Sequence, residues 1–376
     1  MFTTDFADAV KLVTNAVFPE DIFIQKESSP KVVFRLLRSA LHEDFAPANQ
    51  KSLAGDSFSR LHLAWEIAEA AIADKTFGTK TKRIESHNSA KSGISFFVKS
   101  KKGIYGDLIS IMEGSVSHVY LGTDKDGRKV TIKIAAGPAC NQFLENEATN
   151  LKLLLSEFPA TEPGKYYPTL VDNFFIMSAG NKLAVNVTLH CDGYTPLSGV
   201  LGLFQSAGMP IEVRATAWMY NRILEALAHA HPLKIVHGGV HPDNILVHPE
   251  SHRIVLTGWT SSVRTPVKVP YANQSYVDLY PREVVGDRAN RKSALSTDLY
   301  MAAATVTTVL RGNVAQATFP HSVPHEIRAF LSARLIPDVG LRDAVAIQQR
   351  DRFGEVLKVL YGPPKFLPFV LPNTRS

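Results

Sequence analysis

Cysteine is scarce in this chain: only Cys140 and Cys191 occur among 376 residues. Two thiols cannot supply a disulfide framework, and such scarcity fits a reducing compartment. We interpret both as inert, buried thiols. A chain of this length can bury a large core without covalent staples, so we expect hydrophobic packing to hold the fold together.

Long apolar runs are also lacking. None approaches the roughly 20 residues that cross a bilayer, and the longest, "LYMAAATVTTVL" at 299–310, predicts a buried core helix. The start of the chain carries early acids and no signal-peptide pattern. The formal net charge of +6 is spread along the chain, which indicates solvated surface and not a nucleic-acid site. We expect a cytoplasmic protein that contacts no membrane.

Two amphipathic helices are predicted within residues 1–74. Ser29 is a good N-cap and Pro30 suits the first helical position. Apolar residues then follow at helical spacing in two segments that flank a short polar loop, which predicts an antiparallel helix pair. These residues are Val33, Phe34, Leu37, Leu41, Phe58, Leu61, Trp65 and Ala68.

The loop between these helices reads His42-Glu43-Asp44. The arrangement resembles a J-domain, whose loop carries His-Pro-Asp after a basic helix and whose role is to stimulate Hsp70 ATPases. Glu43 replaces the proline, which would stiffen the loop, so the resemblance implies impaired stimulation. A helical adaptor with no Hsp70 role is the alternative interpretation of this module.

Residues 75–104 are basic and rich in Ser and Gly, which predicts a linker with a short strand at "ISFFV". Strand-like runs follow from Tyr105 on, with a hairpin turn at Asp126-Gly127. Helical patterns dominate after Gly199. This order predicts an α+β arrangement of two lobes, a β-rich lobe at 105–198 and a helical lobe at 199–362, with a tail at 363–376.

Residues 105–362 carry several motifs in the order of the protein kinase superfamily, which this region resembles. In "MEGSVSHVY" the family's glycine-rich loop keeps only Gly114, and "VTIK" places Lys133 at the family's phosphate-binding lysine. Glu147 in the next helix is the candidate partner of that lysine, with Glu145 the alternate. The resemblance implies a two-lobed kinase-like fold with an ATP-binding cleft.

The stretch "HGGVHPDNIL" at 237–246 resembles the family's catalytic loop. Gly239 stands where the family has its catalytic aspartate, whereas Asn244, a metal ligand in the family, remains. In "VLTGWTSS", Gly258 stands at the metal-binding aspartate, and a slip of one residue would put Thr257 there. Both acids of the family's chemistry are therefore missing.

Structural residues of the family are retained. The resemblance places Asp298 where the family anchors the catalytic-loop backbone, and Glu283 in "LYPREVV" where it has its Ala-Pro-Glu element. His231 and His237 stand at positions of structural histidines. The pattern is that of a kinase scaffold without its reacting groups.

Glycine can neither accept a proton nor bind Mg²⁺, and phosphoryl transfer needs a base and carboxylate-bound metal. We therefore expect no metal site and at most weak ATP binding without Mg²⁺. Asp243 is the fallback base. The histidines between 229 and 252 do not predict a zinc site, because Gly238-Gly239 opposes a helix that would pair His237 with His241.

The sequence thus predicts a pseudokinase-like scaffold or regulatory protein that binds a protein partner and is not an enzyme. Two alternatives stay open. One is a divergent, active serine/threonine-type kinase that uses ATP. The other is a J-domain-type co-chaperone that recruits an Hsp70, a molecular-chaperone role.

Overall fold

The computed structural model describes residues 5–15, 22–25, 28–42, 46–73, 96–158, 165–178, 181–264, 273–285, 294–336 and 345–372. The fold is α+β, as predicted. No helix among these residues is both long and apolar enough to cross a membrane. The chain divides into two compact units, Met1–Pro138 with Phe174–Val185 and Ala139–Asn173 with Asn186–Ser376. The boundaries predicted at 74, 104, 198 and 362 stay predictions.

The first unit begins with helices that share one core. They are α1 Phe6–Asn15, α3 Pro30–Ala40 and α4 Lys51–Ala73. Ser29 has the extended backbone of an N-cap before Pro30, although its side chain makes no capping hydrogen bond. The rings of Phe34 and Trp65 stack at 4.8 Å, and the predicted apolar stripe of α3 is buried. The predicted pair α3 and α4 is confirmed.

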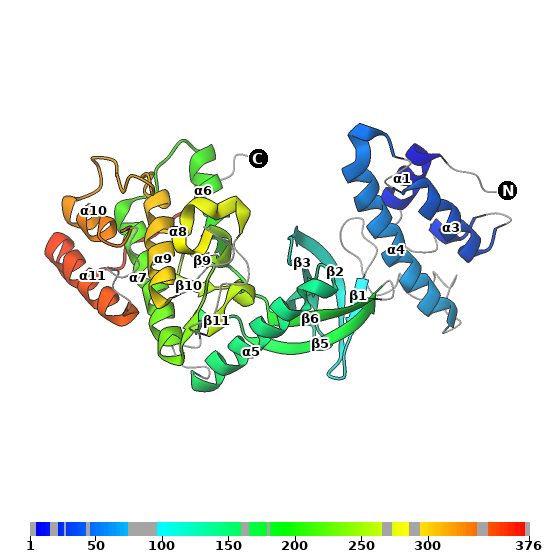
Figure 1. Ribbon diagram of the computed structural model, residues 1–376, viewed down its shortest axis with the longest axis horizontal. Coiled ribbons are helices and arrows are strands. Elements are labelled where there is room, and N and C mark those ends of the chain that lie inside the picture. Colours follow the sequence, from blue (N-terminus) through cyan, green and yellow to red (C-terminus); the bar gives the residue numbers. More distant parts are fainter. Residues whose placement is uncertain are drawn as a thin grey trace. The chain divides into compact units, whose positions relative to one another are not determined.

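The same unit wholly contains four strands, β1 to β4, of a six-stranded sheet (Figure 1). The strand order of this sheet is β1-β2-β3-β4-β6-β5. The predicted turn at Asp126-Gly127 joins β3 to β4: Gly127 has φ +76° and donates its N–H to the Asp124 carbonyl at 3.0 Å. A positive φ is easy for glycine alone, so this turn is confirmed. The strands are β1 Phe96–Lys99, β2 Ile104–Glu113, β3 Ser117–Thr123, β4 Lys129–Ala135, β5 Leu170–Ser178 and β6 Asn181–Leu189.

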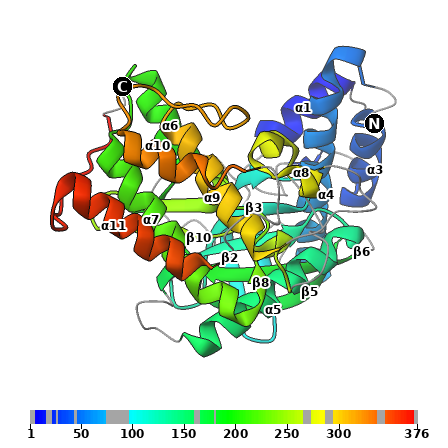
Figure 2. The ribbon, with the colours of Figure 1, turned by 60° about the vertical axis from the view of Figure 1, so that its left-hand side comes forward.

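The second unit packs helices around α7 Val213–Ala230, with α11 Ala346–Tyr361 running alongside it (Figure 2). Helix α9 Leu295–Val309 is buried over most of its length, as predicted for the apolar run there. The remaining helices are α5 Asn141–Glu157, α6 Leu197–Ser206, α8 Arg282–Val285 and α10 His325–Ser332.

This unit also contains short strands that the prediction of a helical lobe did not include. One sheet has the order β10-β9-β7, and β11 pairs with β8. The loop at 237–244 begins directly after β8 and ends where β9 begins. Their bounds are β7 Thr195–Pro196, β8 Ile235–Val236, β9 Ile245–His248, β10 Arg253–Leu256 and β11 Val263–Arg264.

Cys140 and Cys191 are only partly buried, so the prediction that both are buried was wrong. Cys140 lies just before α5 and Cys191 lies just after β6. Connecting segments of this kind lie closer to the surface than the centres of helices and strands. Neither forms a disulfide. Burial raises the pKa of the Cys191 thiol to about 11, so this thiol is protonated and unreactive at neutral pH.

Candidate functional site

The centre of the candidate site is a loop held by one buried carboxylate. Asp298 at the start of α9 is completely buried and accepts the backbone N–H groups of His237 at 2.7 Å and Gly238 at 2.8 Å. Its Oδ2 also contacts His231 Nε2 at 3.0 Å. A buried carboxylate is stable only when hydrogen bonds compensate its lost hydration. Asp298 thus holds the backbone of this loop, and its correspondence to the kinase anchor stays a prediction.

The His237 ring bridges two strand ends. Its Nδ1 accepts the Gly239 N–H at 3.1 Å, so its Nε2 carries the hydrogen and donates to the Thr257 carbonyl at 2.7 Å. The ring also meets Trp259 edge to face at 4.4 Å. The His237 ring therefore ties the loop to the end of β10, and the structural role that the kinase resemblance gives it stays a prediction.

The Asn244 side chain contacts other residues of its own loop. Its Nδ2 donates to the Gly239 carbonyl at 2.9 Å and lies 2.9 Å from His241 Nε2. Its backbone carbonyl accepts the Thr257 N–H at 2.8 Å. The Nδ2 group of Asn244 is thus committed to the loop itself, and both positions that could match the family's metal-binding aspartate, Thr257 and Gly258, lie beside this residue.

Gly258 faces the side chain of Asn244 at very short range. A Cβ atom built on Gly258 would lie 2.2 Å from Asn244 Cγ and 2.2 Å from its Oδ1. Gly258 also has φ +77°, a conformation that side chains disfavour. Gly239 is less crowded, since its Cβ would lie 3.2 Å from Asn244 Nδ2. The Asn244 carboxamide therefore fills the space that an aspartate at 258 would enter.

A second cluster forms around His241. Its ring is buried and stacks on Tyr276 at 4.4 Å and 16°. Burial lowers the pKa of His241 to about 4, so the imidazole is neutral and its Nε2 accepts from Asn244. The Tyr276 hydroxyl donates to Asp243, and burial with that bond raises the pKa of Tyr276. Asp243, the fallback base, is thus engaged by a neighbour.

The predicted nucleotide-binding residues lie in both compact units. Glu147 of α5 is buried and accepts from Asn186 Nδ2 at 3.0 Å, whereas the alternate Glu145 is exposed. Lys133 lies on β4 opposite Val119 and belongs to the other unit. Its pairing with Glu147 and with phosphate stays a prediction.

The glycine-loop candidate has a structural explanation. The Gly114 N–H donates to the Ser117 carbonyl at 3.0 Å, and a Cβ on Gly114 would lie 2.9 Å from that oxygen. Glycine is required for this tight β2–β3 connection, and its amide is engaged within the hairpin. A role in holding phosphate stays a prediction.

Sequence reasoning missed the contact that holds the segment after Trp259. Asn150 Nδ2 donates to Ser262 Oγ at 2.7 Å, and Asn146 Nδ2 donates to the Ser262 carbonyl. Both asparagines lie on one face of α5, four residues apart, a spacing visible in the sequence. Two amides on the face that also buries Glu147 could have signalled a buried polar contact.

Of the remaining predicted residues, Glu283 lies partly buried in α8. His42 is exposed and its ring meets Phe58 edge to face at 6.0 Å. Glu43 and Asp44 lie outside the described residues.

Chemically, the two carboxylates described at this site, Asp243 and Asp298, are each engaged by neighbouring groups. Within the described ranges no group of three His, Cys, Asp or Glu side chains is placed to hold a metal ion. Asp298 uses both oxygens on its own loop, and Asp243 accepts from Tyr276. Neutral hydrogen-bonding groups dominate the rest of the site.

Comparison with known proteins gave no relative: no protein-family model matches the chain, and no curated protein sequence matches it significantly.

Proposed function

We propose that this chain is a pseudokinase-like binding or scaffold protein that performs no phosphoryl transfer. One observation supports this most: the Asn244 carboxamide fills the space in front of Gly258, where the resemblance expects a metal-binding carboxylate. With glycine at 239 and 258, neither position supplies the carboxylate oxygens that Mg²⁺ prefers. Such a site suits a protein that works through its surface.

The preserved anchor supports the same proposal. Asp298 still fixes the backbone of residues 237 and 238 with two N–H···O bonds. A loop that keeps its backbone conformation but lacks both acids has no general base. Such a loop can support folding but not phosphoryl transfer. The kinase-like, two-lobed fold is itself part of this proposal.

The decisive test is phosphoryl transfer by the purified wild type. With ATP and Mg²⁺ we expect no phosphate on the protein itself or on generic substrates, at a level equal to that of Lys133→Ala. Robust Mg²⁺-dependent phosphorylation that survives repurification and disappears in Lys133→Ala would establish an active, divergent kinase. Asp243 would then be the first base to examine.

Restoring the acids is a weaker test for a reason that the geometry gives. Gly258→Asp would place its Cβ against Asn244 at 2.2 Å on a backbone with positive φ. The new carboxylate can enter only if Asn244 leaves. We therefore expect Gly239→Asp with Gly258→Asp to lower stability before it restores any activity.

The helical module at the N-terminus supports partner docking as a second function. Lys31, Arg35 and Arg38 are exposed along α3 at spacings of four and three residues, which places them on one face. Such a basic stripe fits an acidic protein surface. An Hsp70 is the partner that the J-domain resemblance suggests.

Hsp70 ATPase stimulation tests that partner. We expect weak stimulation by the wild type and a clear gain in Glu43→Pro, since proline restores the family's loop residue. Arg35→Glu in the Glu43→Pro background should abolish the gain. Strong stimulation by the wild type would show that Glu43 does not disable the loop, and no gain in Glu43→Pro would favour an adaptor without an Hsp70 role.

A further inference from the structure

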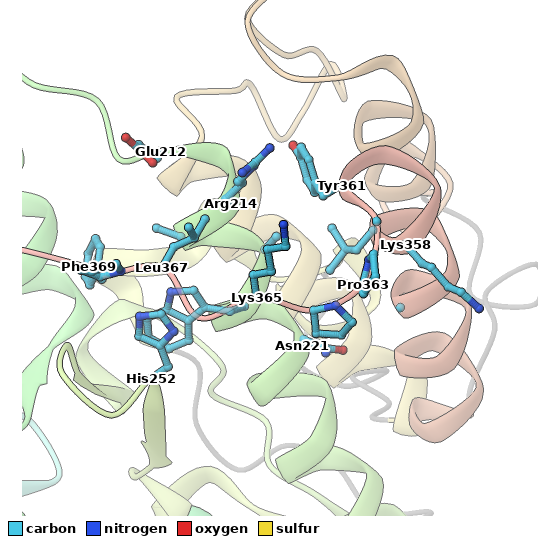
Figure 3. Close-up of a pocket in the computed structure, with 18 of the residues that line it drawn as sticks. Glu212, Arg214, Asn221, His252, Lys358, Tyr361, Pro363, Lys365, Leu367 and Phe369 are labelled. Atoms are coloured by element: carbon cyan, nitrogen blue, oxygen red, sulfur yellow. The ribbon is translucent and has the colours of Figure 1, made fainter.

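A cavity of about 610 Å³ lies in the second unit, away from the loop that Asp298 holds. Its walls come from α7, from α11 and from the chain after α11, where residues 362–370 run extended (Figure 3). This volume falls within the usual range of pockets that bind small molecules. It is too small for a folded partner.

The walls are mostly apolar and braced by stacked rings. The Trp218 ring of α7 stacks on the His252 ring with centroids 4.5 Å apart and an interplanar angle of 4°. The Phe366 ring also stacks on His252, with centroids 4.3 Å apart. Phe369 stacks on Phe204 at 5.7 Å. Such contacts preform the cavity, so that an occupant need not pay for ordering it.

The charged side chains at the cavity are mainly cationic. Arg214, Lys358 and Lys365 line it against a single carboxylate, Glu212. Figure 3 shows Lys365 directed toward Arg214 and Tyr361, and the end of Lys358 pointing away from them. The Arg214 guanidinium lies over the Tyr361 ring at 4.4 Å. A positive mouth over an apolar interior favours an apolar molecule with one negative charge.

Three of the lining side chains carry buried polar atoms that have no hydrogen-bond partner among the described residues. These atoms are Trp218 Nε1, Asn221 Oδ1 and His252 Nε2. A buried polar atom without a partner is costly, and its persistence calls for an explanation. A few polar groups in an otherwise apolar wall are what fixes the orientation of a small ligand.

We propose that this cavity binds a small, largely apolar organic anion, its apolar body against Trp218 and Phe369 and its acidic group near Lys365. The proposal does not depend on the proposed function, because none of the residues that argue for it belongs to the kinase-like loop. It adds a ligand site to a protein whose polar centre is closed.

The experiment uses a matched pair of fluorescent probes on the full chain. One is 8-anilinonaphthalene-1-sulfonate, an aromatic monoanion, and the other is its uncharged counterpart N-phenyl-1-naphthylamine. Gly354→Phe fills the cavity: Gly354 lines it, and a Cβ there meets no atom within 4 Å. Replacing a glycine inside α11 also favours the helix, so the fold is retained, which circular dichroism checks.

We expect Gly354→Phe to weaken the binding of both probes about tenfold or more, since a pocket buries most of a small ligand's surface. Lys365→Met should weaken the anionic probe by about two- to fivefold, the range of an exposed ion pair, and leave the neutral probe unchanged. The matched control Lys152→Met changes an exposed lysine of α5 that does not line the cavity, and it should change the binding of neither probe.

Unchanged binding of both probes in Gly354→Phe would overturn the site. Equal effects of Lys365→Met on the two probes, or equal effects of Lys365→Met and Lys152→Met on the anion, would overturn the assignment of an anionic ligand.

Discussion

Gly258→Ala measures how fully Asn244 occupies the position of the missing acid. Alanine at φ +77° costs about 1–2 kcal/mol because the left-handed region disfavours a Cβ. The new Cβ would lie 2.2 Å from Asn244 Cγ, and overpacking of this kind costs about 1–3 kcal/mol. We expect Gly258→Ala to lower the free energy of unfolding by roughly 2–5 kcal/mol.

A double-mutant cycle separates these two costs. Asn244→Ala removes the atoms that the new Cβ would meet, at the loss of the bond to the Gly239 carbonyl. In the double variant only the backbone cost of Gly258→Ala remains. The two changes should therefore couple favourably by about 1–3 kcal/mol, the overpacking part of the single variant.

Urea unfolding followed by tryptophan fluorescence provides the assay, with Trp259 next to the substituted glycine. Gly239→Ala is the matched control, since its Cβ would lie 3.2 Å from Asn244 Nδ2 and its φ is not positive. It should cost clearly less than Gly258→Ala. Additivity of Gly258→Ala and Asn244→Ala within about 0.5 kcal/mol would refute the account of a filled position.

Two further predictions concern the same unit. The pKa of His241 lies near 4, below its ordinary value of 6.5, so the unfolded chain takes up the proton first and stability falls as the pH drops from 6.5 toward 4. We expect His241 to contribute about 3 kcal/mol to that loss, and His241→Gln should flatten the curve of unfolding free energy against pH; an unchanged slope would contradict this. Asp298→Asn turns a charged acceptor of two backbone N–H groups into a neutral amide, and should lower the free energy of unfolding by about 3 kcal/mol, measured with urea; a loss below about 1 kcal/mol would mean that other contacts hold the loop.

Local patterns predicted the parts of the fold that depend on local rules. The periodic apolar residues from Val33 to Leu41 gave α3, and the Asp126-Gly127 pair gave the β3–β4 turn. Helix α1 was missed although Phe6, Ala9 and Val13 have helical spacing, so the signal was present there. The order of motifs singled out Asp298, whose carboxylate accepts two N–H groups of the loop, and its kinase-like role stays a prediction.

Contacts between distant segments could not be predicted in the same way. The sequence placed Asn244 and Gly258 fourteen positions apart and gave no sign that the amide of one would fill the space of the other. Stacking of Tyr276 on His241 likewise joins two segments that are far apart in the sequence. The cavity arises only when residues 362–370 lie over α7, because a pocket is a property of packing and not of one segment.

Calorimetric titration of the purified protein with ATP, with and without Mg²⁺, tests the central claim most directly. Because Asn244 fills the space before Gly258 and glycine supplies no carboxylate at 239 or 258, the account predicts weak or absent binding that Mg²⁺ does not strengthen. Tight binding that requires Mg²⁺ would contradict it.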